Sequence, residues 1–160
     1  MLKYRRNGQY EDIPHYIIDK MGNVFYIFDT NYYSKGINEV VDKKLIKVAL
    51  ENFGWLKKNT ITGFLHNWIG DTYRAEPYYN TWRNHLFWDK YTKEQLTSTK
   101  NLIDELCDKH KIDKKIIKTN NLITNPHKIN GILFKSNYSD IYTDINNSFN
   151  LNIFEDYDKL

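Results

Sequence analysis

The sequence predicts a single α/β domain in which helices flank a mixed central β-sheet. Three patterns support this prediction: a β-branched and aromatic hairpin near the N-terminus, an alternating apolar strand after it, and a long amphipathic helix in the second half. With 160 residues, of which 41% are hydrophobic, the chain is long enough for one compact domain and short for two. We therefore expect one domain over residues 1–160, with residues 1–13 as an N-terminal extension.

The predicted hairpin lies in the segment HYIIDKMGNVFYIF. Its two strands, Tyr16 to Ile18 and Val24 to Phe28, are rich in β-branched and aromatic residues. Between them, residues 19–23 form the turn, where Gly22 can adopt a positive φ without a steric penalty.

A third strand is predicted from Leu45 to Phe53, because Ile46, Val48 and Leu50 alternate with more polar positions until Gly54. Residues 55–91 follow as an aromatic-rich insertion that contains all four tryptophans. It has turn signals at Gly63, Gly70 and Pro77, and we assign it no secondary structure. Its rings favour a small additional core, with stacking on a sugar or a base as the alternative.

The predicted helix runs from about Lys93 to His110. Thr92 and Gln95 have the spacing of a capping box, and the apolar positions, Cys107 included, lie on one face. This placement favours a buried structural role for Cys107, the only cysteine. The sequence further predicts a short strand at Gly131 to Phe134 and a final short helix near Ser148 to Asp156.

The composition indicates which partners and which cellular compartment to expect. The net charge of +3 comes from interleaved acidic and basic residues, so we expect no nucleic-acid partner. No segment has transmembrane length and the N-terminus lacks the apolar run of a secretory signal, which predicts no membrane contact and a cytoplasmic protein. Abundant Asn, Lys and Ile suit an A/T-rich genome such as that of a phage, in which case we expect host-cell cytoplasm or the virion.

Four motifs, in order, resemble the N-acetylmuramoyl-L-alanine amidase family, which includes phage endolysins and peptidoglycan recognition proteins. The hairpin is similar to "H-y-v-I-d-r-d-G-x-i-y", LIKVALENFG to the strand "S-I-G-I-E-L-x-N-F-G", YTKEQLTSTKNLIDELCDKHKI to the helix "y-T-x-x-Q-…-L-…-L", and TDINNSFNLNIF to the closing "T-D-P-G-p-a-F-…-w". The resemblance spans about His15 to Phe154 and implies an amidase-like fold.

The resemblance implies a zinc site that this sequence does not complete. The family holds zinc with a histidine on a first strand, a second histidine before the closing loop, and an aspartate or cysteine in that loop. Asp144 matches the aspartate, but Phe134 or Lys135 stands at the second histidine and Tyr142 replaces a frequent lysine. Fourteen residues precede His15, too few for the family's first strand and helix, so we expect the chain to lack both.

We therefore expect a catalytically degenerate amidase-like protein with no catalytic residues, no metal ligands and no cofactor, in which Asp144 is a vestigial ligand position. The former groove is expected to bind a peptidoglycan fragment, another small polar ligand or a protein partner. The candidate groove residues are His15, Asn52, Trp68, Trp82, Phe134, Lys135, Tyr142 and Asp144.

Two alternatives remain open. The first is an active zinc-dependent amidase that combines Asp144 with His66, His85 or His127. The second is a structural or inhibitory viral protein that uses the fold only as a scaffold for a protein partner.

Overall fold

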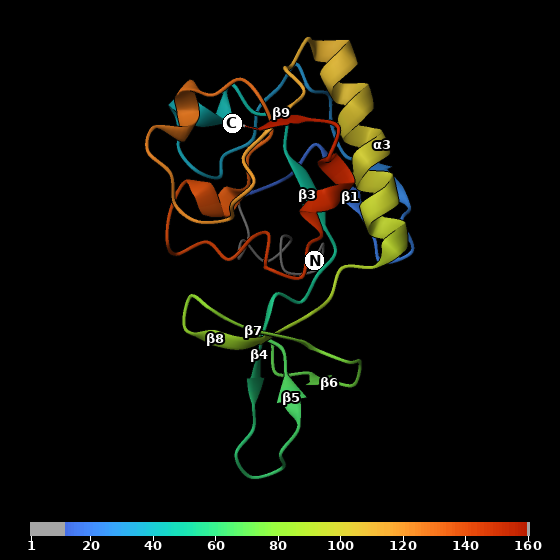
Figure 1. The fold of residues 1–160 in the computed structure, drawn as a ribbon, viewed down its shortest axis with the longest axis vertical. Coiled ribbons are helices and arrows are strands. Elements are labelled where there is room, and N and C mark those ends of the chain that lie inside the picture. Colours follow the sequence, from blue (N-terminus) through green and yellow to red (C-terminus); the bar gives the residue numbers. More distant parts are fainter. Residues whose placement is uncertain (1–11, 160) are drawn as a thin grey trace.

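A computed structural model describes residues 12–159 as a mixed α/β protein with three separate β-sheets. The N-terminal extension expected over residues 1–13 lies outside the described residues, apart from its last two positions. Figure 1 shows a body that carries helix α3 and a three-stranded sheet, and an arm below it built from strands β4 to β8. No helix among residues 12–159 has the length and apolar character to cross a membrane.

The body sheet has the strand order β2-β1-β3 and is mixed, as the sequence predicts. Strand β1 (Tyr16–Ile18) pairs antiparallel with β2 (Val24–Tyr26) and parallel with β3 (Val48–Leu50). The hairpin prediction is confirmed, although β2 ends at Tyr26 and not at Phe28. Gly22 has the expected positive φ of 83° in the turn.

Strand β3 is much shorter than the predicted span of Leu45 to Phe53. After Leu50, the Glu51 N–H still bonds to the Ile18 carbonyl at 2.7 Å, but Asn52 then forms a local turn by accepting from the Gly54 N–H at 2.7 Å. Gly54 has a φ of 71°, which ends the extended backbone.

Helix α3 (Lys93–His110) has the predicted bounds. The Thr92 hydroxyl accepts from the Gln95 N–H at 3.1 Å, and the Gln95 side chain accepts from the Thr92 N–H at 3.2 Å, which confirms the capping box. The helix packs Leu102 and Leu106 against Ile18 of β1, with Ile46, Val48 and Leu50 around them. Cys107 is buried in a neighbouring cluster with Phe134, Phe149 and Phe154, as its place on the apolar face predicts.

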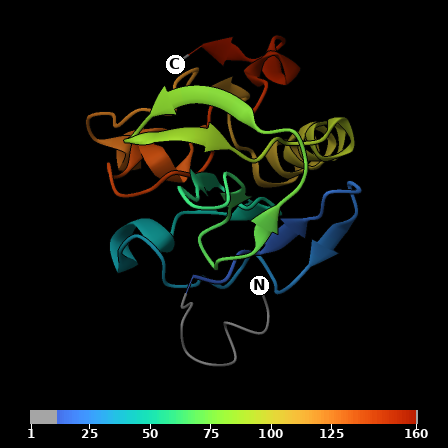
Figure 2. The same cartoon turned by 90° about the horizontal axis from the view of Figure 1, so that it is seen from below.

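The arm is the part of the fold that the sequence analysis did not assign. Its five strands have the order β6-β5-β4-β8-β7, and Figure 2 shows the sheet from below. Neighbouring strands are antiparallel throughout, and β7 is irregular between Tyr79 and Trp82. The strands are β4 (Trp55–Lys58), β5 (Leu65–His66), β6 (Thr72–Tyr73), β7 (Tyr78–Trp82) and β8 (His85–Trp88).

The remaining elements are short. They are helix α2 (Glu39–Asp42), β9 (Lys115–Ile116) paired in parallel with β10 (Asp158–Lys159), and 3-10 helices at Pro126–Lys128, Lys135–Asn137 and Leu151–Phe154. The final helix was therefore predicted in the right place but is a single 3-10 segment.

The predicted strand from Gly131 to Phe134 is wrong. Ile132 makes one isolated bridge to Ile116. The Phe134 N–H then bonds to the Asn137 side chain at 2.8 Å, which starts the 3-10 turn and removes the donor that a strand would use.

Candidate functional site

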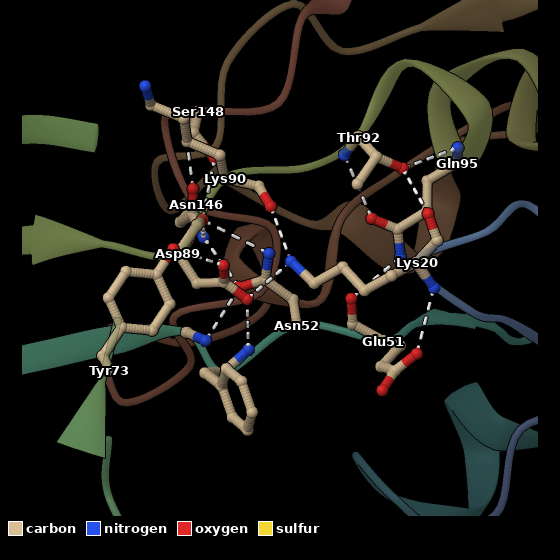
Figure 3. Close-up of polar contacts among 12 residues, drawn as sticks. Lys20, Glu51, Asn52, Tyr73, Asp89, Lys90, Thr92, Gln95, Asn146 and Ser148 are labelled. Atoms are coloured by element: carbon tan, nitrogen blue, oxygen red, sulfur yellow. Dashed lines mark hydrogen bonds and ion pairs between the residues drawn. The ribbon is translucent and has the colours of Figure 1, made fainter. Parts of the chain in front are cut away.

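A buried carboxylate joins the arm to the body. Asp89 follows β8 and is 3% exposed. Its carboxylate accepts from Lys20 Nζ at 2.6 Å, from the Phe53 N–H at 2.8 Å and from the Tyr73 hydroxyl at 2.9 Å (Figure 3). Tyr73 belongs to the arm and Lys20 to the body hairpin, so this one side chain links the two parts.

Further bonds extend this Asp89 junction. The Asp89 carbonyl accepts from the side chains of Asn52, Asn146 and Ser148 at distances of 3.2, 3.2 and 3.0 Å (Figure 3). Lys20 also donates to the Lys90 carbonyl at 2.6 Å. Because buried polar groups cost free energy unless they are paired, this degree of satisfaction indicates a structural role for the junction.

A second connection runs from the arm to the closing loop. Arg83 lies in the turn between β7 and β8, and its guanidinium donates to the carbonyls of Ser136 at 2.9 Å, Ser139 at 2.8 Å and Tyr142. The same group lies over the Trp82 ring, 4.7 Å from its centre. The arm therefore holds the backbone of residues 136–142 in place.

Lys135, Tyr142 and Asp144 lie in or beside that loop, and Asp12 reaches Lys135 from the N-terminal part of the chain. We call these four residues the Asp144 cluster. Lys135 Nζ lies 2.9 Å from an Asp12 carboxylate oxygen and 4.6 Å from the centre of the Tyr142 ring. Asp12 also pairs with Lys47 at 3.0 Å. The Asp144 carbonyl accepts from the Ser136 N–H at 2.7 Å, which fixes the backbone beside Lys135.

The electrostatics of the cluster differ between its two carboxylates. Burial would raise the pKa of Asp12, but the ion pairs with Lys135 and Lys47 outweigh it and hold that pKa below its ordinary value. Desolvation raises the pKa of Asp144, and the positive charge of Lys135 opposes this rise while the negative charge of Asp12 adds to it. Asp144 as a whole residue is exposed, although protein atoms surround its carboxyl group.

The structure divides the eight sequence-predicted groove residues. Lys135, Tyr142 and Asp144 form one cluster, whereas Phe134 is buried in the core beside Phe149. The other four lie elsewhere. Asn52 belongs to the Asp89 junction, and His15 lies in the body. Trp82 packs under Arg83, and Trp68 is 49% exposed on the arm between β5 and β6.

His15 is fully buried and uses both ring nitrogens. Nδ1 accepts from the Lys47 N–H at 3.0 Å, and Nε2 lies 2.9 Å from the Tyr32 carbonyl, an arrangement that one neutral tautomer satisfies. The ring also stacks on Phe28, with 4.3 Å between centres. Burial is the largest cause of a lowered His15 pKa, and the positive charge of Lys47 acts in the same direction.

This arrangement predicts acid sensitivity. Since the folded pKa of His15 lies below the ordinary value of 6.5, the unfolded chain binds more protons near that pH, and stability falls as pH drops through 6.5. We expect the free energy of unfolding in urea to decrease between about pH 7.5 and pH 5. The decrease should be smaller in His15→Gln and unchanged in His127→Gln, because His127 is exposed. Equal pH dependence in all three proteins would contradict this role of His15.

The Asp144 cluster does not fit a zinc ion. A zinc site needs neutral or anionic donor atoms around the metal, whereas Lys135 places an ammonium group beside the two carboxylates. Within residues 12–159, no three His, Cys, Asp or Glu side chains are grouped to hold a metal. His66 Nδ1 lies 3.0 Å from the Gly70 carbonyl, and His85 stacks on Trp55. The expected absence of zinc stays a prediction.

Sequence reasoning missed two residues that shape this site, Asp12 and Lys47, and gave a different partner to a third, Arg83. Asp12 and Lys47 reach the cluster from distant parts of the chain, and no local pattern marks them. Arg83 did carry a signal, because it stands beside Trp82 in the aromatic segment, but its guanidinium faces carbonyls of the protein itself. Comparison of the chain with protein-family models, with curated proteins and with solved structures gave no match.

Proposed function

We propose that this chain is an amidase-like protein without zinc-dependent hydrolysis, which binds a peptidoglycan fragment or another small polar ligand at the Asp144 cluster. The observation that carries the proposal is the position of Lys135, whose ammonium group lies beside the carboxylate of Asp12 and acts on that of Asp144. The positive charge of Lys135 compensates the negative charge of the carboxylates, which would otherwise attract a metal ion.

The family part of the proposal rests on the four sequence motifs. A hairpin whose first strand pairs in parallel with a third strand, covered by a capped helix, agrees with the order of the motifs that resemble the amidase family. Asp144, at the position that resembles the family's aspartate, comes after the 3-10 helix Lys135–Asn137.

The chemistry of the cluster favours a ligand with groups of both signs. Asp144 is an exposed residue whose carboxylate can accept from amine or amide N–H groups, and the Lys135 ammonium group can donate to a carboxylate. The peptide stem of peptidoglycan has both kinds of group, which is why we favour it over a neutral sugar.

Calorimetric titration with a soluble disaccharide-peptide tests this proposal. We expect binding by the wild type, and at least about tenfold weaker binding by Asp144→Asn, since a hydrogen bond to a charged group contributes about 1.5–3 kcal/mol. Asp108→Asn removes an exposed carboxylate from α3 and serves as the matched control, with unchanged binding.

Two results would overturn the proposal. One is the absence of disaccharide-peptide binding in the wild type. The other is stoichiometric zinc in the purified protein together with chelator-sensitive release of stem peptides from cell walls, which would establish the active amidase instead.

A further inference from the structure

The loop between β4 and β5 forms the free end of the arm, and it presents apolar side chains to solvent. Figure 1 shows this loop as the part of the arm farthest from the body. We define the tip loop as residues 59–64. Within it, Ile61 is 94% exposed and Phe64 61% exposed, the first being the most exposed of the large hydrophobic side chains among residues 12–159. Isolated exposed apolar residues are common, but here two such side chains lie in one projecting loop.

The charges around the tip loop have one sign. Lys57 and Lys58 are both exposed and stand directly before the loop. From Asn52 to Gly70 the sequence has no acidic residue. An apolar tip adjacent to lysines complements a lipid layer that has an apolar interior and negatively charged headgroups.

The backbone of the tip loop is already hydrogen-bonded within the loop. The Asn59 carboxamide oxygen accepts from the N–H groups of Ile61 at 2.9 Å and Thr62 at 3.0 Å. The Gly63 N–H bonds to the Asn59 carbonyl at 2.9 Å, and the Asn59 N–H bonds to the Phe64 carbonyl at 2.8 Å. Because unpaired backbone groups are costly outside water, this pairing lowers the cost of moving the tip into a less polar medium.

We propose that the tip loop inserts into the interfacial region of an anionic lipid bilayer, with Ile61 and Phe64 in the apolar layer and Lys57 and Lys58 at the headgroups. The proposal is independent of the ligand at the Asp144 cluster. The sequence predicts no membrane contact because no segment has transmembrane length, and a surface-bound loop needs no such segment. A convex tip with one aliphatic and one aromatic side chain offers little shape complementarity to a rigid protein, and no row of flat rings for a glycan.

Co-sedimentation with vesicles tests the insertion. We expect the full chain to bind vesicles of equal parts phosphatidylcholine and phosphatidylglycerol, and to bind phosphatidylcholine alone more weakly. The double variant Ile61→Ser, Phe64→Ser should lower the partition coefficient at least about tenfold, because it removes both apolar side chains that would enter the bilayer. The double variant Lys57→Gln, Lys58→Gln should lower binding to the anionic vesicles about tenfold and leave binding to neutral vesicles unchanged.

Met21→Ser is the matched control, since Met21 is a 77% exposed apolar residue on the body hairpin. It should bind like the wild type. In Phe64→Trp, brominated lipids should quench the added fluorescence. The proposal is overturned if the wild type does not sediment with anionic vesicles, if the serine double variant binds like the wild type, or if the tip instead mediates self-association measured by sedimentation velocity.

Discussion

Replacing Asp89 with alanine should destabilise the protein by about 3–5 kcal/mol, the range observed when one partner of a buried ion pair is removed. The substitution leaves the Lys20 ammonium, the Phe53 N–H and the Tyr73 hydroxyl without their shared acceptor. Burial and the bond to Asp89 both raise the pKa of Tyr73, so its hydroxyl remains a neutral donor that needs an acceptor. Since small domains have a total stability of about 5–15 kcal/mol, the expected loss is a large fraction of the whole.

Urea unfolding at neutral pH, followed by tryptophan fluorescence, measures this effect. Glu76→Ala is a close control, because Glu76 pairs with Lys90 at the same 2.6 Å as Asp89 with Lys20, but is 85% exposed in its side chain. Exposed pairs contribute little, so this variant should unfold like the wild type. Similar unfolding curves for Asp89→Ala and Glu76→Ala would mean that the junction does not hold the arm to the body.

The elements that the sequence predicted are those with local signals. The capping box of α3 involves Thr92 and Gln95, three positions apart, and the hairpin needs a positive φ at Gly22. Each of these signals depends on residues only a few positions apart, so the sequence shows all the residues involved. The fold class, a mixed sheet covered by a helix, follows from these two elements and the alternation of Ile46, Val48 and Leu50.

The arm could not be predicted because two of its strands are very short and the turn between β7 and β8 lacks the usual residues. β5 and β6 have two residues each, too few for an alternating pattern. The turn between β7 and β8 places Arg83 at a φ of 48° and Asn84 at 63°, where the preferred sequence would have Asn followed by Gly. Arg83 is held in this conformation by its bonds to the closing loop, a tertiary cause that local propensity does not contain.

The Asp144 cluster was partly predictable. The resemblance to the amidase family pointed to Lys135, Tyr142 and Asp144, which the structure places together. His15 and Asn52 were also candidate groove residues, and both hydrogen-bond within the fold. The resemblance places His15 at a hairpin position that is not a metal ligand, which agrees with this packing role. A motif gives the chain position of a residue, but the direction of its side chain depends on neighbours that arrive from other segments, as Asp12 does here.

Arg83→Ala should loosen the closing loop and weaken ligand binding at the Asp144 cluster. Arg83 is the donor to three loop carbonyls, and its side chain is 11% exposed. A hydrogen bond to a charged group contributes about 1.5–3 kcal/mol and such terms are not additive, so we expect a loss of about 3 kcal/mol in stability. Amide hydrogen exchange in residues 136–144 should become faster, because this backbone would lose its anchor.

The variant Arg83→Lys tests whether the hydrogen-bonding geometry of the guanidinium matters or only its positive charge. A lysine keeps the positive charge but cannot reach three carbonyls with a planar fork, so it should restore little of the protection from exchange. Arg74→Ala, which removes an exposed arginine from the same arm, should leave both exchange and binding unchanged. If Arg83→Ala loses stability while residues 136–144 exchange at the wild-type rate, Arg83 stabilises only the arm. Faster exchange together with weaker disaccharide-peptide binding would instead show that the arm positions Asp144 through the loop.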